Sequence, residues 1–569
     1  MLLESCDTSV LSTIVNYLRY DHILRLLFSG CRPLIYKLLT GAVTSIWSDR
    51  VQFYDIRAPH QLLRAFTKLV SVDLAGRGDE LFPRDLLAFL PTQLTHLTLR
   101  GSNDEKLFVE NEESGRLMSV KERFPHLLFL ALSCESQTAE DGFGLPDAFI
   151  SELPPSLHTL DLMQNMTITS QASFTESVPC LTRLRLSGNS TWSSSFRLPS
   201  TITSLDLCIS ISTSTVSLLP VHVESLDIIL DTHTGTIEDF VEGLMPTTLT
   251  SLTLWFNDPL SNSCFLLHLP PTLTYLRIPH IWNSTQPLED RATHWKAMRK
   301  LSRLRTLFSH NEPSWVDLPP SLTSITYHGL PFAVPGIVSS PSSSSSSPPS
   351  GSIIGSQTFK EILPNLQSFK YTNTSNDVPL DSSILGTFPD CLHTLRLIPI
   401  QPPHPKDLRA LPPSITFLDL CGRNTEKLLS YSFAHLPRSL LHFQTKFNIF
   451  LKPIQLKDLP PTLTSLEFPM DSSIDDECLS LLPRHLTRLE LGGAKITDKG
   501  VQFLPRGILY LELHNSALTD AAVPHLPPSL TAALLYQAEL TCACVPLLPK
   551  TLDELECKTA DLRSAMLKF

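Results

Sequence analysis

The sequence predicts an α/β solenoid in which each coil contributes one short parallel strand and one short helix. Two observations support this prediction. A phrase of the form Leu-Pro-x-x-Leu-x-x-Leu-x-Leu recurs along the chain and is clearest at 482–491, which reads LPRHLTRLEL. In addition, Ile474, Ile496, Leu518 and Leu540 follow one another at intervals of 22 residues. A fixed period of this length is typical of chains whose units bury their apolar faces only against their neighbours.

The strand of each unit is predicted from alternation. In 486–491 the leucines alternate with Arg488 and Glu490, the period-two pattern of a strand with one buried face. The preceding Leu-Pro favours an extended entry, because proline disfavours the helical conformation of its predecessor. The same pattern recurs from 69–74 to 552–557, which predicts about twenty coils.

The helix of each unit is predicted from capping residues and apolar spacing. Thr497 and Asp498 are candidate N-caps, and Val501 and Leu504 would form the buried side of a short helix. Strand, turn and helix together resemble the leucine-rich repeat, Leu-x-x-Leu-x-Leu. The resemblance implies a curved parallel sheet on the concave face, with short helices and loops on the convex face.

The turn after each strand departs from that family. Ala494 and Ser516 stand where leucine-rich repeats more often have Asn or Cys. Neither residue can supply a ladder of Asn side chains, so we expect the turn to satisfy its backbone polar groups in another way.

Residues 1–50 do not carry the repeat, and apolar spacing predicts three short helices there. Helices of this kind before leucine-rich repeats resemble an F-box protein; the matching text is Val10-Leu-x-x-Ile-Val-x-Tyr-Leu-x-x-Asp-x-x-Leu-x-x-Leu27, followed by Cys31-Arg32. Cys6-Asp7 and Leu34 replace the Leu-Pro and the Trp of that pattern. The resemblance implies that a ubiquitin-ligase adaptor binds Leu11, Ile14, Leu18, Leu24 and Leu27. The alternative is a plain cap that shields the first coil from water.

The repeats form two predicted arms, 51–330 and 358–569, separated by a Ser/Pro-rich insert at 331–357. The insert contains six consecutive serines at 342–347, and a segment of this composition cannot bury enough apolar surface to become ordered.

Composition excludes several classes of protein. A net charge of -11 and a pI near 5.9 argue against a nucleic-acid-binding protein. The chain contains no run of 18 apolar residues, so we expect no membrane span. The first residues lack the basic region of a signal peptide, so we expect no signal peptide either. The 12 cysteines show no paired spacing, which favours a reducing compartment, cytoplasmic or nuclear. No phosphate-binding loop, nucleophile elbow or zinc-protease motif is present, so we expect no enzyme, no cofactor and no metal.

The residues between the strand leucines are predicted to point to the concave face, in columns spaced by about 4.8 Å. One column contains Asp206 and Asp227, and later the run Glu467, Glu490 and Glu512. Such a ladder of like charges costs stability. It indicates either duplicated repeats that have drifted little or a site for a basic ligand. The neighbouring positions add further binding candidates: Arg488, Tyr510, His514 and Tyr536.

We therefore predict a non-catalytic scaffold that binds a protein partner with a Lys/Arg-rich segment. If the F-box resemblance holds, the implied role is substrate recognition in a cullin–RING ubiquitin ligase. The alternative is a free-standing leucine-rich-repeat scaffold with a helical cap. A secreted receptor would require a signal peptide, which the sequence does not show.

Overall fold

A computed structural model describes most of the repeat region. The described residues are 45–51, 68–76, 86–100, 109–111, 116–133, 147–163, 174–187, 197–211, 219–230, 245–256, 266, 268–278, 295–310, 313–329, 358–372, 382–400, 405–421, 433–446, 453–469, 474–492, 495–514, 516–552 and 554–557. The chain divides into two compact units, Met1–Ser284 (unit 1) and Thr285–Phe569 (unit 2). Each unit is a stack of strand-and-helix coils.

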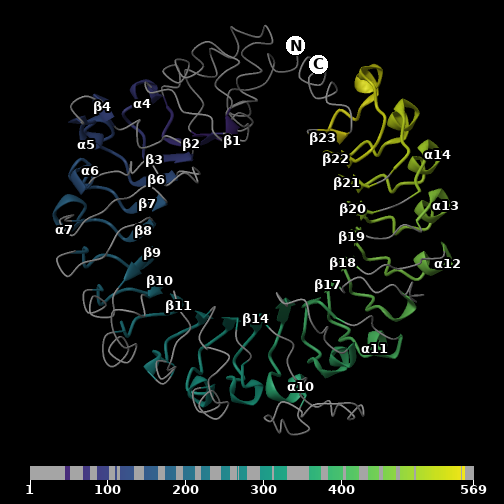
Figure 1. Cartoon of the computed structure of the whole chain (residues 1–569), viewed down its shortest axis with the longest axis horizontal. Coiled ribbons are helices and arrows are strands. Elements are labelled where there is room, and N and C mark those ends of the chain that lie inside the picture. The colour runs from purple at the N-terminus through teal and green to yellow at the C-terminus, as the bar shows by residue number, and fades with distance from the viewer. Residues whose placement is uncertain are drawn as a thin grey trace, which may run out of the picture. The chain divides into compact units, whose positions relative to one another are not determined.

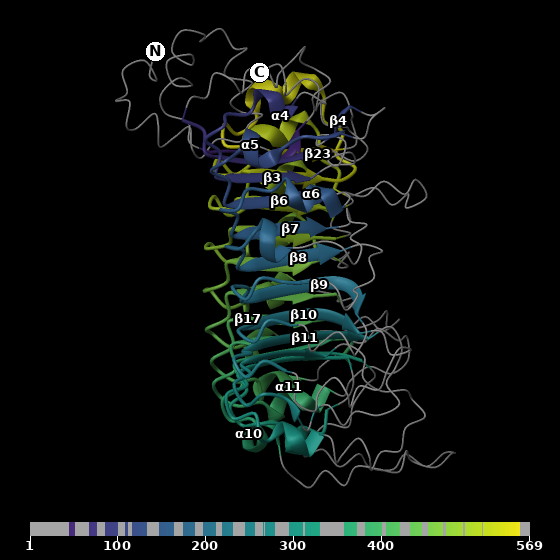
Figure 2. The same cartoon turned by 90° about the vertical axis from the view of Figure 1, so that its left-hand side faces the viewer.

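Unit 1 contains a parallel sheet in which each strand pairs with the next strand of the repeat (Figures 1 and 2). Its strands are β1 (Ser45–Val51), β2 (Ser71–Gly76), β3 (His96–Arg100), β6 (Phe129–Ser133), β7 (Thr159–Met163), β8 (Arg183–Ser187), β9 (Ser204–Ile211), β10 (Ser225–Leu230), β11 (Ser251–Phe256) and β12 (Tyr275–Ile278). Short helices lie on the other side of the coils: α4 (Leu86–Phe89), α5 (Val120–Arg123), α6 (Asp147–Ser151) and α7 (Phe174–Ser177). A separate antiparallel pair is formed by β4 (Val109–Asn111) and β5 (Arg116–Leu117).

Unit 2 repeats this architecture with shorter strands. They are β13 (Thr306–Ser309), β14 (Ser324–His328), β15 (Ser368–Thr372), β16 (Thr394–Ile398), β17 (Phe417–Leu420), β18 (His442–Thr445), β19 (Ser465–Phe468), β20 (Arg488–Leu491), β21 (Tyr510–Leu513), β22 (Ala532–Leu535) and β23 (Glu554–Cys557). Each of them pairs in parallel with the next.

The opposite side of unit 2 carries α-helices and 3₁₀ helices. They are η7 (Trp315–Asp317), α10 (Phe359–Ile362), η8 (Ser382–Thr387), α11 (Pro405–Arg409), η9 (Phe433–His435), α12 (Pro453–Leu456), α13 (Asp476–Leu479), α14 (Asp498–Val501), η10 (Asp520–His525) and η11 (Cys542–Leu547). Pro524 and Pro546 lie inside η10 and η11. A proline has no N–H to donate, and its ring clashes with the carbonyl group four residues earlier, which disfavours a regular α-helix in these coils.

The leucines of the repeat form the core. Leu486, Leu489 and Leu491 are 0% exposed, and their counterparts Leu181 and Leu184 in unit 1 are also 0% exposed. Because all of these side chains point into the coil, the residues between them are left on the other face of the sheet. The predicted alternation is confirmed, and with it the leucine-rich-repeat solenoid.

Hydroxyl groups connect many of the coils to the preceding one. In the phrase Pro-Pro-Thr-Leu, the Thr462 hydroxyl lies 2.8 Å from the carbonyl oxygen of Arg438 and 2.7 Å from that of Leu440. Ser529 makes the same pair of contacts with Arg506 and Ile508. This explains why Ser or Thr so often precedes the first leucine, a recurrence that the sequence shows without revealing its cause.

On the convex side, an aspartate–threonine ladder provides hydrogen-bond acceptors for backbone N–H groups at the starts of the helices. The Asp476 carboxylate accepts hydrogen bonds from the backbone N–H and the hydroxyl of Thr497, at 2.8 and 2.6 Å. Asp498 binds Thr519 in the same way one coil later, and the pattern recurs once more at 520 and 541. Thr497 also caps α14, as predicted, by accepting from the Lys499 N–H. The ladder therefore connects the starts of the convex helices in successive coils.

Several predictions fall outside the described residues. They include the F-box-like leucines (Leu11, Ile14, Leu18, Leu24 and Leu27) and the Ser/Pro-rich insert 331–357. β1 begins at Ser45 and pairs with β2, so a strand of the solenoid lies within the range 1–50. In the part of the chain that is described, every helix is too short or too polar to cross a bilayer.

Candidate protein-binding face

The side chains between the strand leucines emerge on the face of the sheet that carries no helices, here called the strand face. In unit 2, Glu467 (β19), Glu490 (β20) and Glu512 (β21) are directly opposite one another in the parallel register. Neighbouring strands are about 4.8 Å apart, so the three carboxyl groups form one line across the sheet. Their side chains are only 10%, 16% and 14% exposed.

Arg488 lies beside this line and neutralises part of it. Its Nε donates to Glu467 Oε1 at 2.8 Å, and its Nη2 is 3.8 Å from Glu490 Oε2. The guanidinium also lies 3.8 Å from the ring centroid of Tyr510, within cation–π range. The predicted ladder of like charges is therefore partly compensated from the neighbouring column.

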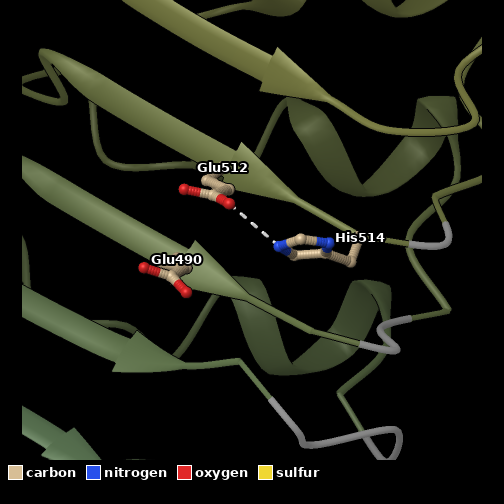
Figure 3. A group of neighbouring side chains, drawn as sticks. All are labelled: Glu490, Glu512 and His514. Atoms are coloured by element: carbon tan, nitrogen blue, oxygen red, sulfur yellow. Dashed lines mark hydrogen bonds and ion pairs between the residues drawn. The ribbon is translucent and has the colours of Figure 1, made fainter. Parts of the chain in front are cut away.

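Glu512 is held from both sides. The Tyr510 hydroxyl donates to Glu512 Oε2 at 2.6 Å, and His514 Nε2 lies 2.9 Å from Glu512 Oε1 (Figure 3). The His514 ring stacks on the Tyr536 ring with centroids 4.6 Å apart. We call these seven residues (Glu467, Arg488, Glu490, Tyr510, Glu512, His514 and Tyr536) the glutamate row.

The glutamate row carries more negative than positive charge. Burial raises the pKa of Glu490, and the carboxylates of Glu512 and Glu467 raise it further. Burial and the hydrogen bond to Glu512 likewise raise the pKa of the Tyr510 hydroxyl, which keeps it protonated as a donor. With three carboxylates and one guanidinium, this part of the strand face attracts cations.

Unit 1 carries a second charged group, which we call the aspartate row: Asp161, Arg185, Asp206, Asp227, Trp255 and Arg277. Arg185 Nε lies 2.7 Å from Asp206 Oδ2, and its Nη1 lies 3.7 Å from Asp161 Oδ2. The Trp255 ring N–H donates to Asp227 Oδ1 at 3.1 Å. Each carboxylate in this row therefore lies beside a cation or a donor of the same row.

Two further contacts complete the aspartate row. The Arg277 guanidinium lies 4.5 Å from the ring centroid of Trp255. Burial raises the pKa of Asp227 to about 6, and the neighbouring Asp206 contributes to the rise.

The structure brings the predicted binding residues together in two groups. Asp206 and Asp227 are register partners on β9 and β10, and the seven predicted residues of unit 2 form the glutamate row. Their role in binding stays a prediction. Sequence reasoning missed Trp255, although it occupies the position directly after the second strand leucine, the same position as His514. That position lies on the strand face, so the repeat alone could have identified Trp255 as a candidate binding residue.

No protein-family model matches the chain, and no curated protein matches it. Among solved structures, CroV588, described as a novel circular LRR protein, is 19% identical, with a TM-score of 0.40 over 92% of this chain and 67% of that one. The internalin InlF from Listeria monocytogenes is 16% identical, with a TM-score of 0.37 over 61% of this chain and 89% of that one. The plant peptide hormone receptor RGFR1, solved with RGF2, is 15% identical, with a TM-score of 0.35 over 92% and 82%. The chain's own repeat, its parallel register and its buried leucines make it a leucine-rich-repeat solenoid.

Proposed function

We propose that the protein is a non-catalytic scaffold that binds a Lys/Arg-rich protein segment on the strand face of unit 2. The observation that carries the proposal is the line of Glu467, Glu490 and Glu512, which has one guanidinium for three carboxylates. Neighbouring coils fix the backbone beneath this line through the strand ladder, so little order is lost on binding.

The residues around the line suit a basic side chain. A lysine or arginine that reaches Glu490 would form a charge-assisted hydrogen bond there, whereas at Glu512 it would compete with Tyr510 and His514. The stacked rings of His514 and Tyr536 offer a flat surface beside these carboxylates, onto which a guanidinium can pack. The scaffold would bind its partner without catalysing a reaction. Its effect would be to raise the local concentration of the bound protein.

The aspartate row is proposed as a weaker contact surface for the same class of segment. Asp206 and Asp227 would be the contacting residues there. Arg185 and Trp255 already occupy both carboxylates, so a basic ligand must compete with them.

The test compares a triple variant, Glu467→Gln, Glu490→Gln and Glu512→Gln, with the wild-type chain. The probes are Lys-rich, Arg-rich and acidic peptides, and the readout is the dissociation constant from fluorescence anisotropy. Loss of three charge contacts, each worth about 0.2–1 kcal/mol, is expected to weaken basic-peptide binding about tenfold.

The matched control removes the same charge from the helix side, with Glu122→Gln, Glu176→Gln and Glu477→Gln, which are all exposed. This control is expected to bind like wild type. Equal affinity of the strand-face variant and the control, or equal binding of acidic and basic peptides, would refute the proposal.

A finer role is proposed from the N-terminal motif alone: substrate recognition in a cullin–RING ubiquitin ligase, with the adaptor bound at Leu11, Ile14, Leu18, Leu24 and Leu27. A pull-down of purified adaptor with the full chain and with a chain beginning at Ser45 tests it, since β1 begins there. Adaptor binding only by the full chain is the expected result. Absence of binding, or binding that survives the deletion, would leave the free-standing scaffold.

We further propose a cytoplasmic or nuclear location. None of the eight cysteines in the described ranges forms a disulfide bond, which supports a reducing compartment.

A further inference from the structure

Three metal-binding side chains converge at one end of the glutamate row. Glu490, Glu512 and His514 each offer one donor atom, and these atoms lie within 4.8 Å of one another. Figure 3 shows Glu490 on one strand, Glu512 on the next and His514 just past the end of that second strand, with the three side chains grouped together. Two carboxylate oxygens and one imidazole nitrogen form a donor set suited to zinc, which binds three protein ligands and leaves a fourth position open.

The backbone holds these residues in place. Glu490 and Glu512 are register partners, and the His514 N–H donates to the Leu491 carbonyl at 2.9 Å, which extends the ladder past β21. The two-residue spacing of Glu512 and His514 puts both side chains on the same face. In the preceding coil Gly492 occupies the position of His514, and a Cβ there would lie 1.5 Å from the Pro469 carbonyl oxygen. Only glycine fits at 492, so no side chain from that position competes for the space beside Glu490.

Contacts outside the three residues orient the donors. Tyr510 binds Glu512 through Oε2 and leaves Oε1 facing His514. Stacking on Tyr536 fixes the plane of the His514 ring, with Nε2 directed at the carboxylates. Supporting contacts of this kind are typical of metal ligands.

We propose that Glu490, Glu512 and His514 bind one Zn²⁺ ion. Zinc binds histidine nitrogen and carboxylate oxygen at about 2.0–2.2 Å, so tetrahedral donors lie about 3.4 Å apart. Glu490 must therefore turn its carboxylate toward the other two donors, and Zn²⁺ replaces the proton shared by His514 and Glu512. The fourth position is open to water or to a donor from a bound protein. This proposal stands apart from peptide binding, although both use the same carboxylates.

The test is calorimetric titration of the full-length chain with Zn²⁺ in metal-free buffer. The readout is the number of equivalents lost relative to wild type, because cysteine thiols elsewhere can also bind zinc. His514→Ala and the isosteric Glu490→Gln are each expected to remove one equivalent or weaken it at least tenfold. Tyr510→Phe, which removes only the supporting hydroxyl, is expected to weaken it about 10-fold or more.

A control variant, His485→Ala, removes an exposed histidine that precedes β20 in the same coil as Glu490, and it is expected to leave the titration unchanged. Unchanged zinc binding by both His514→Ala and Glu490→Gln, with wild-type thermal unfolding, would overturn the proposal. So would a wild-type chain that binds no zinc. Glu467→Gln separates the two proposals, because it is expected to weaken basic-peptide binding and leave zinc binding intact.

Discussion

The aspartate row of unit 1 and the glutamate row of unit 2 occupy the same positions of the repeat but balance charge differently. In the aspartate row a cation interrupts the central column, since Arg185 lies between Asp161 and Asp206. In the glutamate row three acids follow one another without interruption, and the cation comes from the neighbouring column. The scaffold is the same in both units, so the order of residues within one column decides whether the face satisfies its own charges or leaves some for a partner.

The largest expected effect is a loss of unfolding free energy when a core leucine beneath either row is removed. It tests whether the two rows lie on the same kind of leucine core. Leu184→Ala in unit 1 and Leu489→Ala in unit 2 each remove a side chain that is 0% exposed. We expect each to lower the free energy of unfolding by about 2–5 kcal/mol, because the solenoid closes only partly around the cavity. Denaturant unfolding followed by circular dichroism measures this loss. If one variant were as stable as wild type, the two units would not share the same leucine core and the comparison would fail.

A smaller loss of unfolding free energy is expected when the aspartate–threonine ladder is broken. Asp498→Ala removes the acceptor of both the Thr519 N–H and the Thr519 hydroxyl. The site is exposed, so water replaces part of the loss, and we expect about 1 kcal/mol from denaturant unfolding. Asp498→Asn keeps one acceptor oxygen and should lie between Ala and wild type. Because this ladder lies away from the strand face, basic-peptide affinity should stay at the wild-type value, and a fall in affinity would contradict the separation of the two faces.

How far the sequence predicts these features depends on how local they are. The strands, the buried leucines and the cap at Thr497 follow from spacing within one unit, and all were predicted. Contacts between coils were not predicted. A pairing such as Arg488 with Glu467 depends on how far a side chain extends from one strand to the neighbouring strand. For the same reason the ladder of acids was predicted from the column, while its partial neutralisation was not. The hydroxyl and Asp–Thr ladders left a visible recurrence in the sequence, but only the register shows which carbonyl or N–H each group meets.

A prediction that sharpens the comparison concerns the cation of the glutamate row. Arg488→Gln frees Glu467 from its 2.8 Å contact and leaves the three carboxylates without a guanidinium. We expect basic-peptide affinity to rise several-fold, as measured by fluorescence anisotropy at low salt, while stability falls by up to about 1 kcal/mol. Arg185→Gln in the aspartate row should likewise raise binding there. No rise in either variant would mean that these arginines do not compete with a basic ligand.

The smallest expected effect is a pH dependence that belongs to the aspartate row. Burial and the nearby Asp206 raise the pKa of Asp227 to about 6 from the ordinary 3.8, whereas Trp255 and Arg277 act in the opposite direction. The folded chain therefore holds this proton more tightly than the unfolded chain does. The stability gained from the protonated carboxyl is present at low pH and is lost as the pH rises from about 4 to about 6.

Asp227→Asn keeps the acceptor for the Trp255 N–H but cannot ionise. Its melting temperature should match that of wild type near pH 4 and exceed it by a few degrees at most above pH 6, and thermal unfolding at several pH values measures this. The exposed acid Glu224, changed to Gln, is the control and should show no such pH-dependent difference. A variant that is less stable than wild type above pH 6 would show that the ionised Asp227 stabilises the fold through its contacts. In the aspartate row, the stabilisation of the ionised carboxylates by their neighbours would then exceed the cost of burying them. The contrast with the glutamate row would lie in how completely the charges are paired.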